Sequence, residues 1–497
     1  MLSSLRCRTL LLACAIVGWC CHVAAQSVTP NLNIYTDKGL FYQLPITADT
    51  IHYDGMRLSF PRHNAQPVEL KTTAIDSITV GTVEYRNAVL RITTEDGAEI
   101  ASRTEWLRCH YSMDGGMLFP DFEADGRIRG RGNSTWSWYE YGGDPLIYGR
   151  RPYKIKFDEK QRVLGVNADK TWVLLANWRD GSFMMNAFAN EVGRYLDFAF
   201  TPHNRFCEVY VNDEYMGLYQ LCEQIQEGGH RVDCGENGVL LALDADDGPE
   251  HSPNATNNFW SASYRLPVAV KYPKDEALTD SAMAAIKQEF NAMESLVRRH
   301  NYEEVASVVD IRSLIDFLIV QELTCNVELD APRSMYIYQT DSDHVWHFGP
   351  LWDFDAGFDF QWSDMYTGHT YYASQKLLYG NDPANHPNYS VGTRFFLQMF
   401  ADPRFTAEYK ARWAQVKDGL FTNVFERLDN YRAQLAEALA RNDERWPIYF
   451  DTGGWDWGTW SWNEPSDRVH YDTEYASLRN WVRQRIRVMN TAINKYP

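Results

Sequence analysis

Two carboxylates separated by a single residue, Asp353 and Asp355, lie inside the strongly apolar segment of residues 349–358. Residues two apart in a strand share one face, so both carboxylates are expected to point the same way while the neighbouring aromatic residues are buried. Like charges this close raise each other's pKa unless a cation neutralises them. Paired carboxylate oxygens are typical of an Mg²⁺ site. The spacing favours a metal site at Asp353 and Asp355 over a structural hydrogen-bonding role.

Three polar residues upstream, Asn326, Glu328 and Asp330, follow an apolar segment and precede a predicted strand. The apolar segment, residues 311–323, is hydrophobic on nearly every side and predicts a buried helix with Asp310 as its N-cap. The end of such a helix is a rigid support from which a polar side chain can be presented to a site.

A basic segment at residues 129–136 contains Arg129, Arg131 and Asn133 together with two glycines. Glycine lets backbone N–H groups approach a ligand closely and arginine supplies fixed positive charge, so the segment suits an anion or a phosphate. A strand-end turn with solvated arginines explains the same pattern equally well.

A second basic segment at residues 153–157 alternates apolar side chains with Lys154 and Lys156. In a strand both lysines share one face, and a lysine on a rigid strand is how kinase-like sites reach nucleotide phosphates. A solvated strand face is the alternative and, without context, the preferred interpretation. Glu223, which follows the apolar residues 218–222, is an acid able to pair with such a lysine, although an ordinary surface acid is the commoner case.

The elements that must position these residues change character along the chain. Residues 26–88 alternate in short runs and predict a small N-terminal β region. Longer strands follow, including a hairpin that turns at residues 213–214, and residues 335–353 predict a second hairpin. Amphipathic helices are expected around residues 405–420 and 478–489. Strands first and helices later predict an α+β fold with a sheet-rich first lobe and a helix-rich second lobe.

Composition and the N-terminus restrict the class of protein. Residues 1–25 combine a basic start, a short apolar run and small residues before Gln26, as in a secretory signal peptide, and the run is too short to span a bilayer. We therefore expect a protein of the periplasm or cell surface without a stable membrane span. The net charge of −18 disfavours a nucleic-acid partner. The cysteines after the leader form no zinc motif, and Cys207 and Cys222 either pair or remain buried thiols.

Six strings occur in a characteristic order between about Ile92 and the C-terminus: residues 129–136, 151–156, 174–178, 211–219, 223–225 and 349–355. In this order they resemble the CotH family, which comprises spore-coat protein H and its secreted relatives. The resemblance implies that residues 89–497 form a divergent protein-kinase-like fold. It also implies transfer of the γ-phosphate of ATP, with Mg²⁺ or Mn²⁺, to the hydroxyl groups of a protein substrate.

The same resemblance assigns roles to particular residues. Lys156, or Lys154, matches the phosphate-binding lysine and Glu223 its partner, while the segment of Arg129, Arg131 and Asn133 belongs to the cofactor site. Asp330 matches the catalytic aspartate and Asp353 the metal-binding aspartate, with Asp355 beside it. The order Lys, Glu, Asp, Asp is also that of ordinary protein kinases.

The chain also departs from what kinases and the family usually show. It lacks G-x-G-x-x-G-x-V, H-R-D and D-F-G. Relatives often have Arg-Asn where this chain has Met185-Asn186, and an acid where it has Ala242. The usual Asn-x-Asp is stretched to residues 326–330, which makes Glu328 a rival of Asp330 for the catalytic position.

A second class of function therefore stays open, a non-catalytic surface protein that binds a partner or a glycan. Nucleotide is scarce outside a cell, and tryptophans in residues 454–462 could stack on sugar rings.

Overall fold

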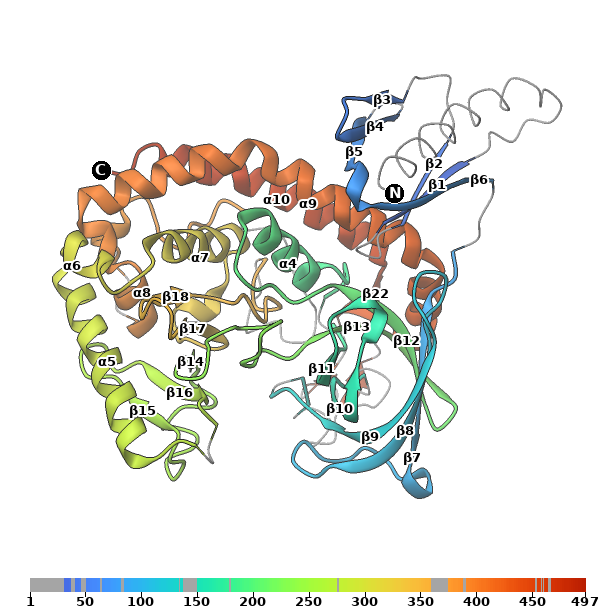
Figure 1. Cartoon of the computed structure of the whole chain (residues 1–497), viewed down its shortest axis with the longest axis horizontal. Coiled ribbons are helices and arrows are strands. Elements are labelled where there is room, and N and C mark those ends of the chain that lie inside the picture. The colour runs from blue at the N-terminus through green and yellow to red at the C-terminus, as the bar shows by residue number, and fades with distance from the viewer. Residues whose placement is uncertain are drawn as a thin grey trace, which may run out of the picture. The chain divides into compact units, whose positions relative to one another are not determined.

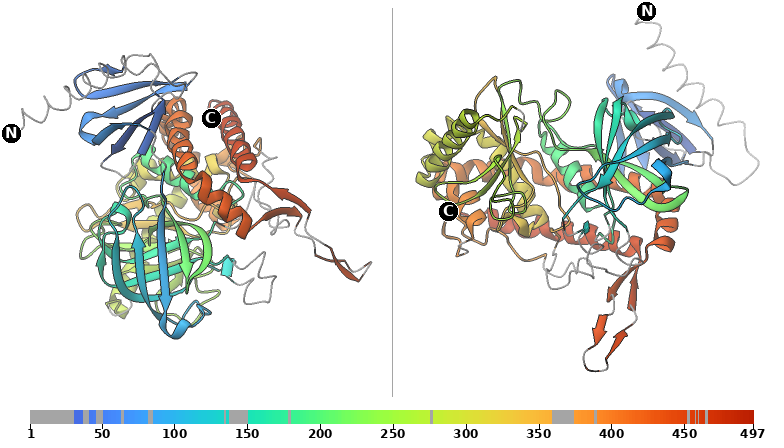
Figure 2. Two further views of the ribbon diagram at one scale, coloured as in Figure 1. Left: turned by 90° about the vertical axis from the view of Figure 1, so that its right-hand side faces the viewer. Right: turned by 90° about the horizontal axis from the view of Figure 1, so that it is seen from below.

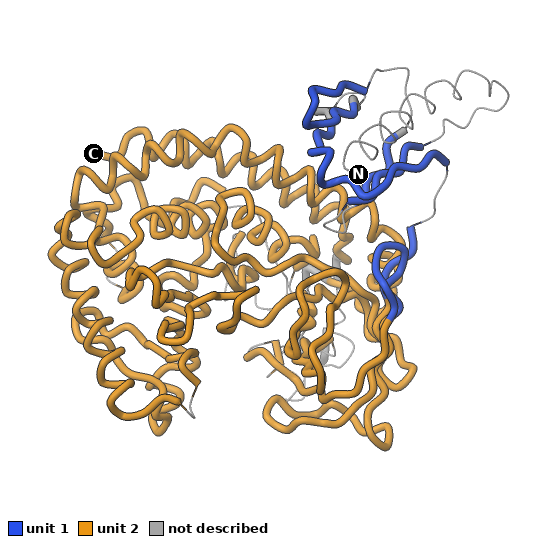
Figure 3. The backbone as a smooth tube through the Cα atoms, viewed as in Figure 1, with its two compact units in different colours: residues 1–88, 114–121 blue, residues 89–113, 122–497 orange. Residues whose placement is uncertain are grey.

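The computed structural model describes residues 31–36, 41–45, 51–62, 65–81, 85–133, 135–136, 150–177, 180–274, 277–358, 374–387, 390–451, 454–456, 458, 460–463 and 466–497. The predicted signal peptide, residues 1–25, lies outside them. The chain divides into two compact units, one of Met1–Ala88 with Asp114–Asp121 and one of Val89–Met113 with Phe122–Pro497 (Figure 3).

The first unit contains two antiparallel sheets of three strands, in the orders β2-β1-β6 and β3-β4-β5. Apolar residues of these strands, such as Ile34 and Val68, are fully buried. The strands are β1 (Asn31–Thr36), β2 (Phe41–Pro45), β3 (His52–Tyr53), β4 (Arg57–Arg62), β5 (Ala65–Lys71) and β6 (Ile75–Val80).

The second unit begins with a closed barrel of seven strands in the order β10-β11-β13-β12-β7-β8-β9 (Figure 1). Alternation in β10 buries Tyr153, Ile155 and Phe157 and leaves the two lysines on the other face, as predicted. Closure of the sheet was not predicted. The strands are β7 (Ala88–Thr94), β8 (Leu107–Asp114), β9 (Phe122–Gly130), β10 (Tyr153–Gln161), β11 (Asp169–Leu175), β12 (Arg205–Val211) and β13 (Glu214–Glu223).

Cys207 and Cys222 are free buried thiols in neighbouring strands of this barrel. Cys207 lies opposite Tyr219 in the β12–β13 register, so the two sulfur-bearing residues are not cross-strand partners. The buried-thiol alternative is therefore the one that the structure adopts.

The second lobe of this unit contains a sheet of five strands in the order β15-β16-β14-β17-β18. Its strands are β14 (Val239–Leu243), β15 (Asn258–Trp260), β16 (Pro267–Tyr272), β17 (Met335–Gln339) and β18 (Trp346–Phe348). Figure 1 shows the helices α5 (Asp280–Arg299), α6 (Tyr302–Ala306) and α7 (Ile311–Thr324) in this lobe. Helix α7 is buried along its length and capped by Asp310, as predicted: the Asp310 side chain accepts hydrogen bonds from the N–H groups of Arg312 and Ser313.

The remaining helices are α4 (Met185–Leu196), α8 (Val391–Phe396), α9 (Pro403–Arg445) and α10 (Tyr471–Ile493). Between α9 and α10, β19 (Ile448–Asp451) pairs with β22 (Ser466–Val469), and β20 (Gly454–Asp456) pairs with β21 (Ser461–Asn463). The β20–β21 hairpin extends away from the helices (Figure 2). The helices of the described part of the chain include none long and apolar enough to cross a membrane. The fold is α+β, with the sheet-rich part first, as predicted.

Candidate functional site

The predicted metal ligands Asp353 and Asp355 lie in a loop, which corrects the prediction of a strand through residue 353. Strand β18 ends at Phe348. Asp353 has a φ of 63°, in the left-handed region, which a strand cannot contain. The two carboxyl groups are nevertheless close enough that, after burial, the charge of Asp355 raises the pKa of Asp353. Their proximity therefore comes from a tight loop and not from strand alternation.

Aromatic residues fix this loop in the core. Trp352, Phe354 and Phe358 are 8%, 1% and 0% exposed, as expected for the apolar residues around the two acids. The Phe354 N–H donates a hydrogen bond of 2.9 Å to Oδ1 of Asn186, at the start of α4. Burial of the aromatic side chains holds the intervening carboxylates in a largely desolvated place.

Glu328 is the third acid at this place. It belongs to a short 3₁₀ turn, Val327–Leu329, just after α7, and is 9% exposed. Its Oε2 atom is buried without a hydrogen-bond partner in the described part of the chain. Burial, followed by the charges of Asp353 and Asp355, raises the pKa of Glu328 well above its usual value. Burial, followed by the charge of Asp355, also raises the pKa of Asp353 to about 8.

The pKa values of Glu328 and Asp353 are raised, and the charge of Asp355 contributes to both increases. Positive charge is therefore missing where these three acids meet. Within the described ranges, no group of three or more His, Cys, Asp or Glu side chains is placed to hold a metal ion. A site that provides one or two carboxylates and leaves the other positions to water and phosphate oxygens is the usual way in which proteins hold Mg²⁺. The donor set at Asp353 and Asp355 fits that kind of site.

Asp244 and Asp246, directly after β14, extend the acidic region. Oδ1 of Asp244 accepts a hydrogen bond of 3.0 Å from the Asp246 N–H, and burial raises the pKa of Asp244 to about 6. Asp246 in turn binds Arg333 at 3.2 Å and the predicted site residue Asn133 at 2.9 Å. No role was expected for Asp244 or Asp246 from the sequence.

The basic segments meet on one face of the barrel. The β9–β10 register sets Lys154 opposite Arg129 and Lys156 opposite Arg127, so two rows of cations are adjacent. Burial, followed by the charges of Arg129 and Arg131, lowers the pKa of Lys154 to about 8. Lys154 is therefore a desolvated lysine surrounded by like charge.

An apolar cluster brings this basic face next to the acidic loop. Val173, the partner of Lys154 in the β10–β11 register, packs in one cluster with Leu240 of β14 and with Trp352. The Arg131 guanidinium lies over the Trp352 ring, 5.5 Å from its centroid. Arg131 also counteracts the rise in the pKa of Asp353. Cations of the barrel and carboxylates of the second lobe therefore belong to one site.

Glu223 does not pair with a lysine of β10. The β11–β13 register sets Glu223 opposite Trp172, in the row of Ile155, whereas Lys154 and Lys156 point to the other face. Glu223 instead accepts a hydrogen bond of 2.8 Å from the His203 N–H, and its other carboxylate oxygen lies 2.6 Å from His203 Nδ1. Glu223 cannot reach these lysines because its side chain and theirs lie on opposite faces of the barrel sheet.

Asp330 is tied to a different element. Its Oδ1 atom accepts hydrogen bonds from the hydroxyl groups of Thr393 and Ser390, at the start of α8. The Gly392 N–H also bonds to the Asp330 carbonyl, at 3.1 Å. Glu328 is thus the acid whose pKa responds to Asp353 and Asp355, while the Asp330 carboxylate is engaged by two hydroxyls.

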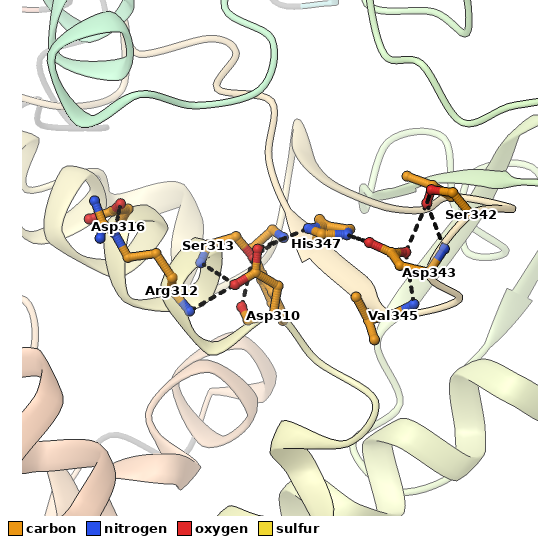
Figure 4. A network of polar contacts seen from close by, with 10 residues as sticks. Asp310, Arg312, Ser313, Asp316, Ser342, Asp343, Val345 and His347 are labelled. Atoms are coloured by element: carbon orange, nitrogen blue, oxygen red, sulfur yellow. Dashed lines mark hydrogen bonds and ion pairs between the residues drawn. The ribbon is translucent and has the colours of Figure 1, made fainter.

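A second polar network lies at the opposite end of α7 (Figure 4). His347 of β18 bridges two carboxylates, with Nδ1 3.0 Å from Oδ2 of Asp310 and Nε2 2.9 Å from Oδ2 of Asp343. Because both ring nitrogens face acceptors, the geometry favours the doubly protonated imidazolium. This network joins the helix that leads to Glu328 to the strand that leads to Asp353.

Comparisons with known proteins identify the family of the chain. No curated protein matches the chain. The family model described as CotH kinase protein matches residues 128–489, which is most of the chain and includes every residue of the site described above from Arg129 onward. The chain belongs to the CotH kinase protein family.

Proposed function

We propose that the second unit binds ATP together with Mg²⁺ or Mn²⁺ and transfers the γ-phosphate to a hydroxyl group of a protein substrate. The observation that carries this proposal is the juxtaposition of desolvated cations and desolvated carboxylates, with Arg131 next to both. Within each group, neighbouring charges of the same sign add to the effect of burial, which favours a counter-charge from a ligand. A nucleotide phosphate and a divalent cation would supply both at once.

In this proposal Asp353 and Asp355 hold the cation, and Lys154, Arg129 and Arg131 hold the phosphates. A bound cation would neutralise negative charge on the phosphate oxygens. Lys154 is the preferred lysine because it is desolvated and lies among Arg129 and Arg131, and an ammonium group in such a place attracts an anion strongly.

Glu328 is our preferred candidate for the group that orients the acceptor hydroxyl and takes its proton. Among the residues that the structure describes, its buried Oε2 atom has no hydrogen-bond partner, so its hydrogen-bonding capacity is unused there. Asp330 is the alternative that the family resemblance favours, but its carboxylate already accepts bonds from Thr393 and Ser390. The two assignments make different predictions for single substitutions.

Calorimetric titration with Mn²⁺ and ATP tests the proposal directly. Asp353→Asn should abolish metal-dependent ATP binding. Glu474→Gln is a matched control because Glu474 is also a buried acid whose pKa burial raises, to about 7, but it lies on α10. Absence of metal-dependent ATP binding in the wild-type protein would end the kinase proposal.

Phosphate transfer to a generic protein acceptor then separates the two acids. Glu328→Gln should lower the transfer rate by roughly two or more orders of magnitude while ATP still binds, as expected for loss of a general base. Asp330→Asn should retain most transfer if Glu328 has this role. The reverse pattern would assign the role to Asp330. Lys154→Met should weaken ATP binding more than Lys156→Met.

Export of the mature protein from residue 26 is a further part of this proposal. It rests on the pattern of residues 1–25 alone. N-terminal sequencing of the protein from its native host should find Gln26 first, and an intact Met1 would contradict export by this route.

A glycan is a second candidate ligand, at the β20–β21 hairpin. Trp460 at its turn is 70% exposed, and Trp455 lies opposite Trp462 in the hairpin register. Exposed indole rings stack on sugar rings and carry much of the affinity of such surfaces. Trp460→Ala should abolish retention on polysaccharide resins if this hairpin binds glycans, and unchanged retention would exclude it.

A further inference from the structure

A chain of side-chain amides runs from the acidic loop into the interior of the second unit. It begins at the Phe354 N–H, which donates to Oδ1 of Asn186 at 2.9 Å. Asn186 Nδ2 donates to Oδ1 of Asn177 at 3.1 Å, and Asn177 Nδ2 donates to Oε1 of Gln220 at 2.9 Å. The first three links thus connect the loop to α4, to the end of β11 and to β13.

The chain continues from Gln220 to a buried charge. Gln220 Nε2 donates to Oδ1 of Asn204 at 2.9 Å, and Asn204 Nδ2 donates to Oε1 of Glu191 at 2.8 Å. Glu191 also binds the Arg194 guanidinium and the Tyr431 hydroxyl, the latter at 2.8 Å. Against the effect of burial, Arg194 lowers the pKa of Glu191 to about 2, so the carboxylate is ionised.

The two ends of the chain determine the direction of every amide between them. A backbone N–H only donates and an ionised carboxylate only accepts. The amides of Asn186, Asn177, Gln220 and Asn204 must therefore all point in the same sense. Turning any one of them around would place two donors or two acceptors against each other.

Burial makes such a reversal costly. Gln220 and Asn204 are 0% and 1% exposed, so water cannot replace a lost partner there. Consecutive hydrogen bonds in a medium of low polarity also polarise and strengthen one another. The chain is therefore a stiff polar connection and not a set of independent contacts.

The end of the amide chain at Asn186 binds a strained part of the acidic loop. Phe354 follows Asp353, whose φ of 63° is uncommon for a residue with a side chain. A hydrogen bond to the next peptide N–H restrains the peptide between them. The direction of the Asp353 carboxylate thus depends on the position of the Asn186 side chain. That position is fixed by the hydrogen bond from Asn186 to Asn177 and by the amides that follow.

We propose that the amide chain from Glu191 through Gln220 to Asn186 is a positioning network for the loop of Asp353 and Asp355. It rests on the proposed function only in the claim that the positioned carboxylates bind a cation. Residues that orient metal ligands typically change metal affinity by 10–100-fold when they are lost. None of the four amide residues needs to touch the substrate for this role.

The test substitutes the middle of the chain and observes its end. Gln220→Met keeps the shape of the side chain and removes both of its hydrogen bonds. Asn442→Leu is the matched control. Asn442 of α9 is 0% exposed, and its Oδ1 accepts a hydrogen bond of 2.9 Å from the N–H of Leu218. Leu218 lies on the same strand β13 as Gln220, but Asn442 is not part of the amide chain. Hydrogen exchange of the Phe354 amide and Mn²⁺ affinity are measured in both variants.

We expect Gln220→Met to speed exchange of the Phe354 amide at least tenfold and to weaken Mn²⁺ binding by roughly 10–100-fold. Asn442→Leu should change neither. Asn204→Leu, one link further from the loop than Gln220, gives the same comparison if Gln220→Met fails to fold. Unchanged exchange in the chain variants, or equal acceleration in the control, overturns the network.

The two readouts keep this inference separate from the proposed function. Faster exchange in Gln220→Met, in a protein that binds no Mn²⁺ even as wild type, supports the network and overturns the metal site. Faster exchange with unchanged Mn²⁺ affinity shows that Asp353 and Asp355 are not the cation's ligands.

Discussion

Two buried glutamates lie six residues apart, Glu322 on α7 and Glu328 just after it, and their surroundings are opposite. Glu322 is 0% exposed and binds the Arg485 guanidinium of α10 and the N–H groups of Leu378 and Tyr379. Glu328 is 9% exposed and faces Asp353 and Asp355, and one of its carboxylate oxygens has no hydrogen-bond partner within the described ranges. Burial raises the pKa of both acids, but at Glu322 the cation and the two N–H groups oppose that rise.

The difference separates a structural charge from a functional one. At Glu322 the protein supplies the counter-charge and the hydrogen bonds, so the acid helps to join α7 to α10. At Glu328 the neighbours add negative charge, and the protein keeps an unfavourable arrangement. Such an arrangement is typical of a site whose missing partner is a ligand, since perturbed acids cluster at functional sites.

Breaking the structural pair should have the largest effect on stability. Arg485→Met leaves Glu322 buried and uncompensated, which should lower the free energy of unfolding by about 3–5 kcal/mol. Urea denaturation monitored by tryptophan fluorescence measures the change. Arg485→Met combined with Glu322→Leu should recover much of the loss, because no unpaired charge then remains. A loss below ~1 kcal/mol in the single variant would show that the pair is not structural.

Neutralising Glu328 should raise the free energy of unfolding, in contrast to the loss expected for Arg485→Met. Glu328→Gln should stabilise the metal-free protein at pH 7–8 by roughly 0.5–2 kcal/mol, because an amide removes one of the repelling charges. The folded-state pKa of Glu328 is raised, so the wild type loses stability as the pH rises above the unfolded value of about 4.3. The gain should therefore vanish below about pH 4. Thermal melts from pH 4 to pH 8 measure it, and destabilisation at pH 8 would contradict the comparison.

The types of the elements followed from local sequence patterns. The alternation in β10 and the all-round apolar character of α7 are periodicities within single segments, and the structure has both. The basic and acidic segments that belong to the site were also recognised, because unusual residue types in apolar surroundings are visible without a fold.

Pairing between distant segments could not be obtained in this way. The partner of Glu223 depends on which residue of β11 lies opposite it, and one step of register decides whether it shares a face with Lys154 or with Ile155. The strand predicted through Asp353 failed because its left-handed backbone is stabilised by Asn186, a residue far away in the sequence. Closure of the barrel is likewise a property of all seven strands together.

The smallest expected effect concerns an intermediate case, in which the counter-charge depends on pH. His347 compensates Asp310 and Asp343 only while its ring is protonated, and its side chain is 16% exposed (Figure 4). Hydrogen bonds to the two carboxylates raise the pKa of His347 against the effect of burial, while Tyr338 stacks on the ring at 4.9 Å.

A histidine whose pKa is raised on folding contributes stability that is fully present below the unfolded value of about 6.5 and is lost as the pH rises through the folded value. His347→Gln should therefore destabilise the protein by about 1–2 kcal/mol at pH 6 and by less at pH 9. His110→Gln is the control, because His110 is 48% exposed although it too contacts an aspartate, Asp125, at 2.8 Å. Its loss should cost under ~0.5 kcal/mol at either pH. Urea denaturation of both variants at the two pH values measures the difference, and equal losses for His347→Gln at pH 6 and pH 9 would show that the ring does not act as a titrating counter-charge.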